Sequence, residues 1–255
     1  MTFTTSREAY DAFMGRYADL LAPRLIAFAG VEPGDRVLDV GCGPGSLTQP
    51  LAELVGPDHV AAVDPSEPFA AANAERVPGA DVQVGSAESL PWPVGSFDAA
   101  LAQLVVNFMS DADAGVAEMR RVVRPGGTIA ACTWDYSGGM TMLRTFWDAA
   151  LSLDPEAPDE SRTMRYNDPD VLRELWLRVG LEAVENDTLV VEAPYRDFGD
   201  YWDPFTGGVG PAGAYTESLE PDRREALREE CRRRLGNPDG PFTLSATAWA
   251  VRGRA

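Results

Sequence analysis

Histidine, lysine and cysteine are scarce in this sequence. Its 255 residues include one histidine, His59, and no lysine, so that all 22 basic residues are arginine. His59 directly precedes a predicted strand at 60–63, and we expect it at the amino edge of a sheet, whereas ligands of α/β sheets bind at the carboxyl edge. A hydrolase whose serine or cysteine is activated by histidine is therefore disfavoured.

The three cysteines limit the chemistry and the setting of the chain. Cys42, Cys132 and Cys231 are far apart and show neither metal-ligand spacing nor even pairing. This pattern predicts no metal site and a reduced, cytoplasmic setting. No apolar run approaches the length of a membrane-spanning helix, and the first residues lack the basic and apolar regions of a signal peptide. We expect no membrane partner.

The chain is strongly acidic, with a formal net charge of −18. Nucleic acid is therefore not an expected partner, because phosphate binding requires a basic face. One basic run, 232–234, lies on a predicted helix that also carries Glu225, Glu229 and Glu230. We expect that helix to present a solvated, ion-paired surface.

A glycine-rich loop at 41–45 is the most informative segment. The residues before it, 37–40, are mostly apolar and predict a buried strand. Gly41, Gly43 and Gly45 permit positive φ and a close approach of a ligand to the backbone, and Pro44 suits the first turn of a helix. The segment predicts a ligand site at the carboxyl end of a parallel sheet. The alternative is a turn that merely connects the strand to the helix.

Asp64 ends the second predicted strand, 19 residues after Gly45. A carboxylate at this position can accept hydrogen bonds from both hydroxyls of a ribose. A nucleoside ligand is therefore predicted, with a simple capping role as the alternative. The glycine spacing differs from the dinucleotide fingerprint, which places a glycine where Ser46 stands.

Strand and helix patterns alternate along the chain. Strands are predicted at about 36–40, 60–63, 81–84, 97–102, 128–132, 183–192 and 243–251. Helices are predicted at 6–29, through Leu47, Leu51 and Leu54, from near Ser66, at 111–123 and at 170–179. Alternation of this kind predicts one α/β domain over 1–255 with a Rossmann-like, doubly wound sheet. We expect the sheet to be mostly parallel, with an antiparallel last strand.

Three segments extend the minimal pattern. The first 30 residues form a predicted helical cap. Insertions at 134–167 and 193–241 follow the fifth and sixth strands and leave the sheet at the edge that carries the glycine-rich loop. We expect these insertions to form a lid and a substrate pocket. The alternative is that they are caps without a functional role or an oligomer contact.

The pattern Asp39-x-Gly41-x-Gly43-x-Gly45 resembles motif I of the class I methyltransferases that use S-adenosylmethionine (SAM). Segments 85–91, 97–108 and 124–127 also resemble conserved regions of that family, in the same order. The flanking segments 10–17 and 198–205 resemble a poorly characterised bacterial subgroup of the methyltransferase type 11 kind.

The resemblance implies SAM as the cofactor and a set of residues that contact it. These are Tyr17, Asp39, Gly41, Gly43, Gly45, Asp64, Pro65, Ser66, Ser86, Ala87, Gln103 and Leu104. Ser86 stands where the family often has an aspartate that accepts from the adenine amino group. The N-terminal helix of the subgroup is expected to fold over SAM, which places Arg16 or Tyr17 near its carboxylate or sulfonium, or else to pack on the sheet as a plain amphipathic helix.

The implied activity is methyl transfer to a small-molecule acceptor by in-line displacement. Such a reaction requires the nucleophile to be held ~3–3.5 Å from the methyl carbon and water to be excluded. No base is evident, which disfavours histidine-assisted O-methylation. Asp135, Tyr136 and Asn107 are candidate catalytic residues, and Trp134, Tyr136, Trp202 and Phe205 are candidates to line the acceptor pocket.

Two other functions fit the same sequence. One is a SAM-binding protein that transfers no methyl group, such as a sensor or a catalyst of another reaction. The other is an NAD-dependent oxidoreductase, against which Gly45 and Ser46 argue. The sequence does not identify the acceptor, the attacked atom or the oligomeric state.

Overall fold

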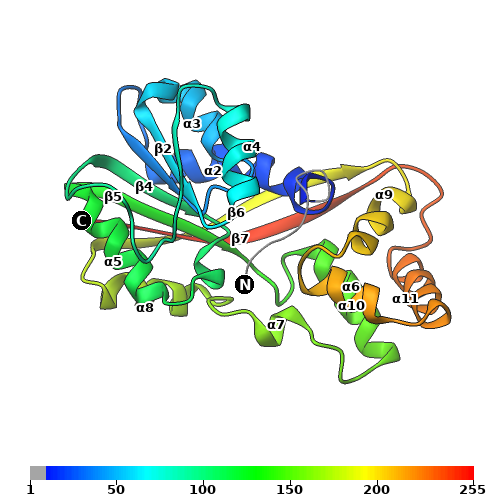
Figure 1. Ribbon diagram of the computed structural model, residues 1–255. Coiled ribbons are helices and arrows are strands. Elements are labelled where there is room, and N and C mark those ends of the chain that lie inside the picture. The colour runs from blue at the N-terminus through cyan, green and yellow to red at the C-terminus, as the bar shows by residue number, and fades with distance from the viewer. Residues whose placement is uncertain (1–9) are drawn as a thin grey trace.

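A single sheet forms the centre of the protein (Figure 1). The computed structural model describes residues 10–255, in which seven strands are ordered β3-β2-β1-β4-β5-β7-β6. The strands are β1 (Val37–Val40), β2 (Val60–Asp64), β3 (Asp81–Val84), β4 (Phe97–Gln103), β5 (Val123–Trp134), β6 (Glu182–Tyr195) and β7 (Phe242–Arg254). Strands β1 to β5 are parallel, and β7 pairs antiparallel with both β5 and β6. The predicted mostly parallel sheet with an antiparallel last strand is confirmed.

Helices cover both faces of the sheet, as a doubly wound fold requires. The main helices are α2 (Arg16–Ala29), α3 (Thr48–Val55), α4 (Glu67–Arg76), α5 (Ala112–Val122), α6 (Thr141–Leu153), α7 (Glu160–Thr163), α8 (Pro169–Arg178), α9 (Phe198–Trp202), α10 (Gly210–Ser218) and α11 (Pro221–Arg234). Short helical turns are η1 (Asp11–Gly15), η2 (Pro57–His59), η3 (Val106–Phe108) and η4 (Asp203–Gly207).

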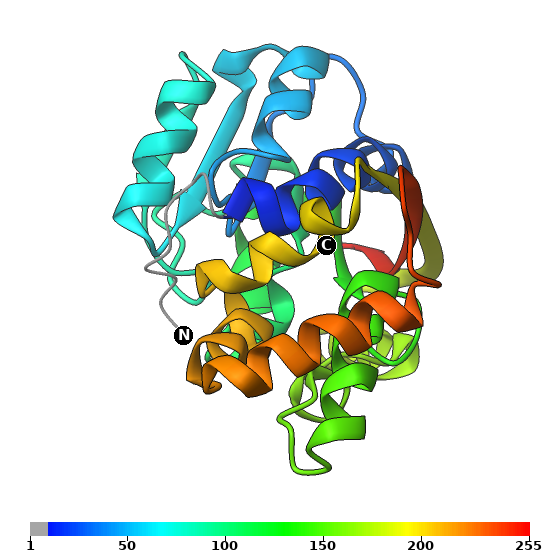
Figure 2. The same ribbon diagram turned by 90° about the vertical axis from the view of Figure 1, so that its right-hand side faces the viewer.

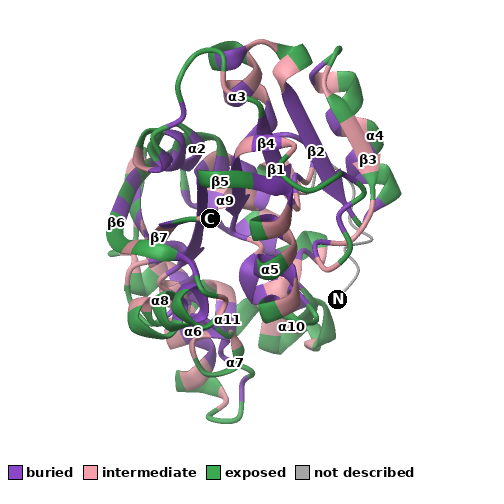
Figure 3. Cartoon of the chain, turned by 90° about the vertical axis from the view of Figure 1, so that its left-hand side faces the viewer, coloured by how far each residue is buried: buried purple, intermediate pink, exposed green. Residues whose placement is uncertain are grey.

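Alternate residues of the central strands face two separate cores. On β4, Leu101 packs with α2 and α3, whereas Ala100 and Ala102 pack with α5 and α8. Because the central strands are buried on both faces, their sequences are mostly apolar, with the buried Asp39 of β1 as an exception. Figure 3 shows these strands buried, whereas β6 at the edge of the sheet is largely exposed.

The segment 124–127 differs from its predicted role as a turn between a helix and the fifth strand. It lies within β5 as a bulge, since Val123 pairs with Phe97 and Thr128 pairs with Ala99. A Cβ on Gly127 would lie 2.5 Å from the carbonyl oxygen of Asp98. Backbone crowding across the bulge therefore requires glycine there.

Both insertions follow strands that end at the same edge of the sheet, because β5 and β6 run in the same direction. The first insertion contributes α6 and α7, and the second contributes α9 to α11. Helices α10 and α11 both contact α6, so the two insertions form one helical layer (Figures 1 and 2). Within residues 10–255, no helix combines the length and the apolar character that a membrane crossing requires.

The predicted helix at 6–29 begins outside the described residues. Its described part starts as the single π-helical turn η1 and continues as α2, which ends at Gly30 with φ 71°. Single π-turns occur often at functional sites. This turn carries Phe13 and Met14 to the cavity described below.

Candidate functional site

Backbone hydrogen bonds hold the glycine-rich loop against β2. The N–H groups of Gly41 and Cys42 donate to the carbonyl of Val63 at 2.8 and 3.0 Å. A Cβ on Gly41, which has φ 71°, would lie 2.5 Å from the methyl groups of Val105, whereas a Cβ on Gly43 would meet no atom within 4 Å. Packing therefore requires the first glycine, and the second leaves open space beside the backbone that a ligand can occupy.

Asp64 joins this loop to the start of α4. Its Oδ2 accepts the N–H of Gly43 at 2.9 Å, and its Oδ1 accepts the N–H of Ser66 at 2.8 Å. Burial raises the pKa of the carboxyl, and these two hydrogen bonds oppose the rise. Each oxygen keeps acceptor capacity for a further donor, such as a ribose hydroxyl.

Asp39 lies beneath the loop, although direct contact with the cofactor was predicted. Its Oδ2 accepts the hydroxyl hydrogen of Thr48 at 2.6 Å, and the Thr48 oxygen accepts from Nδ2 of Asn73 at 2.8 Å. Burial raises the pKa of Asp39 to about 7. A Cβ on Gly45 would lie 2.9 Å from Oδ1 of Asn73. Asp39 and Gly45 are not among the lining residues of the cavity, because both pack against this internal chain of hydrogen bonds.

A cavity of about 310 Å³ opens beside the loop. Nine of the residues predicted to contact the cofactor line it: Gly41, Gly43, Asp64, Pro65, Ser66, Ser86, Ala87, Gln103 and Leu104. Two of the residues predicted for the acceptor pocket, Trp134 and Tyr136, line it as well. The structure therefore brings parts of all five parallel strands to one cavity, whereas His59 lies at the opposite, amino end of β2.

Tyr17 does not line the cavity, in contrast with its predicted contact. Its hydroxyl lies 2.9 Å from that of Tyr195, and its side chain is fully buried. The preceding residue, Arg16, forms an ion pair with Asp200 at 3.0 Å and lies over the ring of Tyr195. Both side chains thus fasten α2 to β6 and α9, so the plain packing role matches their positions better than contact with SAM.

Trp202 and Phe205 also lie outside the cavity. Phe205 is fully buried and stacks on Phe146 at 4.5 Å, and its edge contact with Phe13 is at 5.1 Å. Trp202 packs against Phe205 at 6.1 Å. These aromatic rings support the cavity wall from behind, because Phe13 stands between Phe205 and the cavity.

Gln103 and Leu104 end β4 at the cavity. The Nε2 of Gln103 donates to the carbonyl of Ala18 at 3.0 Å, and its Oε1 has no hydrogen-bond partner among the described residues although the side chain is only 8% exposed. Leu104 has a positive φ of 62°, a conformation that is strained for a residue with a Cβ and concentrates at ligand sites. Gln103 lines the cavity, but its Oε1 is itself buried, so the amide holds α2 against the end of β4 and offers no open acceptor to a ligand.

Ser86 has a carboxylate beside it that sequence reasoning missed. The Ser86 hydroxyl donates to Oε2 of Glu88, and the N–H of Glu88 donates to the Ser86 oxygen at 3.1 Å. Glu88 also accepts the N–H groups of Ser110 and Asp111. Burial raises the pKa of its carboxyl, but the hydrogen bond from Ser86 and these backbone donors together hold it below the usual range. Both Ser86 and Glu88 line the cavity, so negative charge is present two residues after the position where the family often has aspartate.

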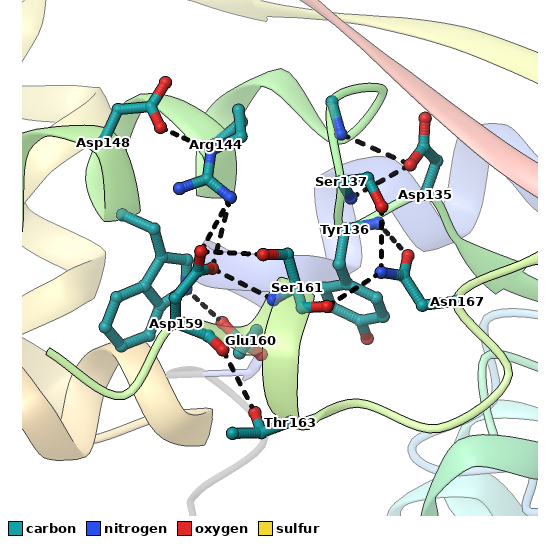
Figure 4. A network of polar contacts seen from close by, with 12 residues as sticks. Asp135, Tyr136, Ser137, Arg144, Asp148, Asp159, Glu160, Ser161, Thr163 and Asn167 are labelled. Carbon is teal, nitrogen blue, oxygen red and sulfur yellow. Dashed lines mark hydrogen bonds and ion pairs between the residues drawn. The ribbon is translucent and has the colours of Figure 1, made fainter. Parts of the chain in front are cut away.

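The three candidate catalytic residues have different positions, and Figure 4 shows two of them, Asp135 and Tyr136. The carboxylate of Asp135 accepts the N–H groups of residues 137–139 and is absent from the lining of the cavity. Tyr136 lines the cavity, and burial raises the pKa of its hydroxyl. Asn107 lies behind it and donates to that hydroxyl at 3.4 Å. Asp135 is therefore a turn residue, and Tyr136 alone of the three faces the cavity.

Several lining residues were not among the residues predicted to contact a ligand. They are Tyr10, Phe13 and Met14 near the N-terminus, Phe69 of α4, Phe108, Glu160 of α7 and the segment 209–211. All except Phe69 and Phe108 come from the N-terminal cap and the two insertions, in which no motif fixed the orientation of single residues. A search for metal ligands among residues 10–255 gives no group of three or more.

Comparison with known proteins agrees with this geometry. Residues 38–131 match the family model described as a methyltransferase domain. Nocamycin O-methyltransferase of Saccharothrix syringae is 29% identical over an alignment of 276 positions that covers all of this chain and 97% of that protein. Curated relatives of 34–38% identity match over shorter stretches, and the chain spans only 30–52% of their lengths.

Solved structures share the fold over most of the chain. A protein of Anaeromyxobacter dehalogenans assigned as a type II methyltransferase is 26% identical, with a TM-score of 0.64 over 91% of this chain and 95% of that one. The [4+2]-cyclase SpnF has a TM-score of 0.59 at 19% identity and covers all of this chain and 88% of its own. At this identity, the similarity to SpnF shows a shared fold and nothing about function.

The sheet order, the glycine-rich loop and the cavity at its edge match the fold of the class I SAM-dependent methyltransferases. The motif-bearing segment of the chain belongs to the methyltransferase domain family of type 11. SAM is the cofactor of this class, and two features of the cavity fit it: the carboxylate of Asp64, which keeps acceptor capacity, and the open space at Gly43.

Proposed function

We propose that this chain transfers the methyl group of SAM to a small-molecule acceptor held in the same cavity. The supporting observation is the continuity of one cavity from the glycine-rich loop and Asp64 to the aromatic residues Trp134 and Tyr136. One end offers polar groups suited to a nucleoside and an amino acid. The other end offers aromatic surface suited to an apolar acceptor.

Each end of SAM has partners in this proposal. Asp64 accepts the ribose hydroxyls, and Ser86 with Ala87 lies at the adenine. The loop at Gly41 and Gly43 passes along the methionine part, beside Gln103 and Leu104 at the end of β4. SAM supplies an electrophilic methyl group on a sulfonium, and the residues of the chain hold the acceptor in line with it.

The helical layer formed by the two insertions acts as the lid in this proposal. Residues 134–167 supply Trp134, Tyr136 and Glu160 to the cavity, and residues 193–241 supply the segment 209–211. The N-terminal cap supplies Phe13 and Met14. Together these residues exclude water from the reacting atoms, which methyl transfer by proximity requires.

A small molecule is the acceptor class we favour. The named relative with full-length coverage is an O-methyltransferase of nocamycin, and the net charge of −18 disfavours nucleic acid. The alternative is a SAM-bound protein that transfers no methyl group, since a protein with this fold is named as a [4+2]-cyclase and a fold does not fix a reaction.

Product analysis tests this proposal. The protein is incubated with SAM labelled in the methyl group and a panel of hydroxylated and aminated small molecules, and labelled products are identified by mass spectrometry. We expect a labelled product together with S-adenosylhomocysteine. Tight SAM binding without any labelled product across the panel would favour the alternative.

A further inference from the structure

Glu160 is a buried carboxylate that faces the cavity. It is the first residue of α7, in the insertion after β5, and its side chain is 4% exposed. Its Oε2 accepts the indole N–H of Trp147 at 2.8 Å. No residue in the described range 10–255 donates a hydrogen bond to its Oε1. One oxygen of a fixed carboxylate is therefore left for a molecule in the cavity.

The preceding carboxylate, Asp159, has the opposite environment (Figure 4). It pairs with Arg144 at 3.1 Å and accepts the N–H and the hydroxyl hydrogen of Ser161, and these contacts hold its pKa below the usual range. Burial raises the pKa of Glu160 to about 7, although the bond from Trp147 opposes the rise. Neighbouring carboxyls with opposite shifts are a pattern typical of acid–base sites.

We propose that Glu160 is the general base that receives the proton of a hydroxyl acceptor, a phenol or an enol, during methyl transfer. This assignment rests on the proposed function. A hydroxyl is a poor nucleophile until its proton is removed, so it requires a base at this place. An acceptor that is already a carboxylate would be repelled by Glu160, and a flat phenol or enol suits the walls formed by Phe13 and Trp134.

The proton and electrons balance without any further reactant. The acceptor oxygen forms a bond to the methyl carbon as its O–H bond breaks. The carbon–sulfur bond breaks with its electron pair remaining on sulfur, which becomes a neutral thioether. The proton moves to Oε1 of Glu160, and the carboxylic acid returns it to solvent after the products leave.

Trp147 is a positioning residue for Glu160. Its ring is 1% exposed and is fixed by an edge contact with Phe146 at 5.0 Å and a tilted contact with Tyr215 at 5.6 Å. Because its N–H occupies Oε2, it directs Oε1 to the cavity. It also favours the ionised carboxylate, which is the form that acts as the base.

The first test is the variant Glu160→Gln, which keeps the size of the side chain and an oxygen for the Trp147 N–H. Substituted phenols and enolised 1,3-diketones are offered with SAM, and the best accepted one serves as the probe. We expect kcat to fall about 100-fold or more while the calorimetric Kd for SAM stays within about twofold, far below the tenfold that corresponds to ~1.4 kcal/mol. The control is Glu156→Gln, an exposed residue of the same insertion, which should match the unsubstituted protein.

The second test is the pH profile. The groups that face Glu160 are Asp159 and Tyr136, with Arg144 behind Asp159. Asp159 is ionised and Tyr136 is protonated throughout the neutral range, so neither adds a limb near pH 7. We expect kcat to rise through about pH 7 as Glu160 loses its proton, and this limb should be absent in Glu160→Gln. In Trp147→Phe this rise in kcat should occur at higher pH, because the hydrogen bond that lowers the pKa of Glu160 is lost.

The third test measures the protonation of Glu160 directly and requires no methyl-accepting substrate. Carbon NMR of glutamate labelled at the carboxyl, compared between the protein and Glu160→Gln, should show one resonance that titrates near pH 7. An ordinary acidic titration of that resonance, or a Glu160→Gln variant with unchanged kcat, would overturn the assignment. So would SAM binding without methylation of any phenol or enol. Failure to bind SAM at all would instead overturn the proposed function.

Discussion

The backbone N–H of Gly43 donates to Oδ2 of Asp64 at 2.9 Å, so the glycine-rich loop and the end of β2 form one unit. The same carboxylate also orders the start of α4 through the N–H of Ser66 at 2.8 Å. A side chain predicted to bind a ribose is therefore already fixed by backbone donors. The fixed carboxylate presents its remaining lone pairs to the cavity without reorganisation.

Replacement of Asp64 by asparagine should weaken SAM binding strongly. The amide keeps the size of the side chain but loses the charge and one acceptor oxygen. Hydrogen bonds to a charged group contribute about 1.5–3 kcal/mol, so Kd should rise about 10- to 100-fold by calorimetry. The control is Asp58→Asn, an exposed residue just before the amino end of the same strand. Equal Kd values for Asp64→Asn and the control would rule out the ribose contact.

Substitution by alanine should affect stability and SAM binding differently at Gly41 and at Gly43. Gly41→Ala places a methyl group 2.5 Å from Val105 at φ 71° and should cost about 3 kcal/mol of stability. Gly43→Ala meets no atom within 4 Å and should cost only about 1 kcal/mol, from its φ. Urea unfolding measures both values. Because the open space at Gly43 borders the cavity, Gly43→Ala should nevertheless weaken SAM binding, and unchanged binding would count against the loop contact.

Asp39 should make the stability depend on pH. Its pKa is raised from 3.8 to about 7 in the folded protein, so its contribution is fully present below about pH 4 and is lost as the pH rises to about 7. A shift of this size corresponds to at most about 4 kcal/mol. Relative to the unsubstituted protein, Asp39→Asn should therefore gain unfolding free energy between pH 4 and pH 8 in urea titrations. A difference that stays constant with pH would show that Asp39 is not perturbed by burial.

Arg16→Gln separates a structural role from a role in SAM binding. Arg16 pairs with Asp200 at 3.0 Å and donates to the carbonyl of Pro194 at 3.2 Å. Loss of this half-buried pair should lower the unfolding free energy by about 1–2 kcal/mol. The Kd for SAM should stay within about twofold of the original. A tenfold rise in Kd with unchanged stability would instead place Arg16 at the cofactor.

Local sequence patterns were sufficient to predict the sheet and the loop. The strand at 37–40 is mostly apolar and runs into Gly41, Gly43 and Gly45, all of which have positive φ in the structure. The same local logic placed Asp64 at the carboxyl end of β2. These features depend on neighbours in the chain, so periodicity and turn chemistry are informative.

The side chains of the insertions were not predictable in the same way. Phe205 and Trp202 have the composition of a substrate pocket but pack behind Phe13, and Glu160 lies in the cavity without a motif. Their orientation depends on how α6, α10 and η4 pack together, which involves contacts between residues far apart in the sequence. Asp39 shows the converse, because its place in the motif predicted contact with the cofactor, whereas its carboxylate accepts a hydrogen bond from Thr48 beneath the loop.

Calorimetric titration of the purified protein with SAM, with a matched titration of NAD, tests the central claim most directly. The account predicts one site for SAM, a Kd that rises at least about tenfold in Asp64→Asn, and no binding of NAD. A folded sample that binds NAD and not SAM would contradict it.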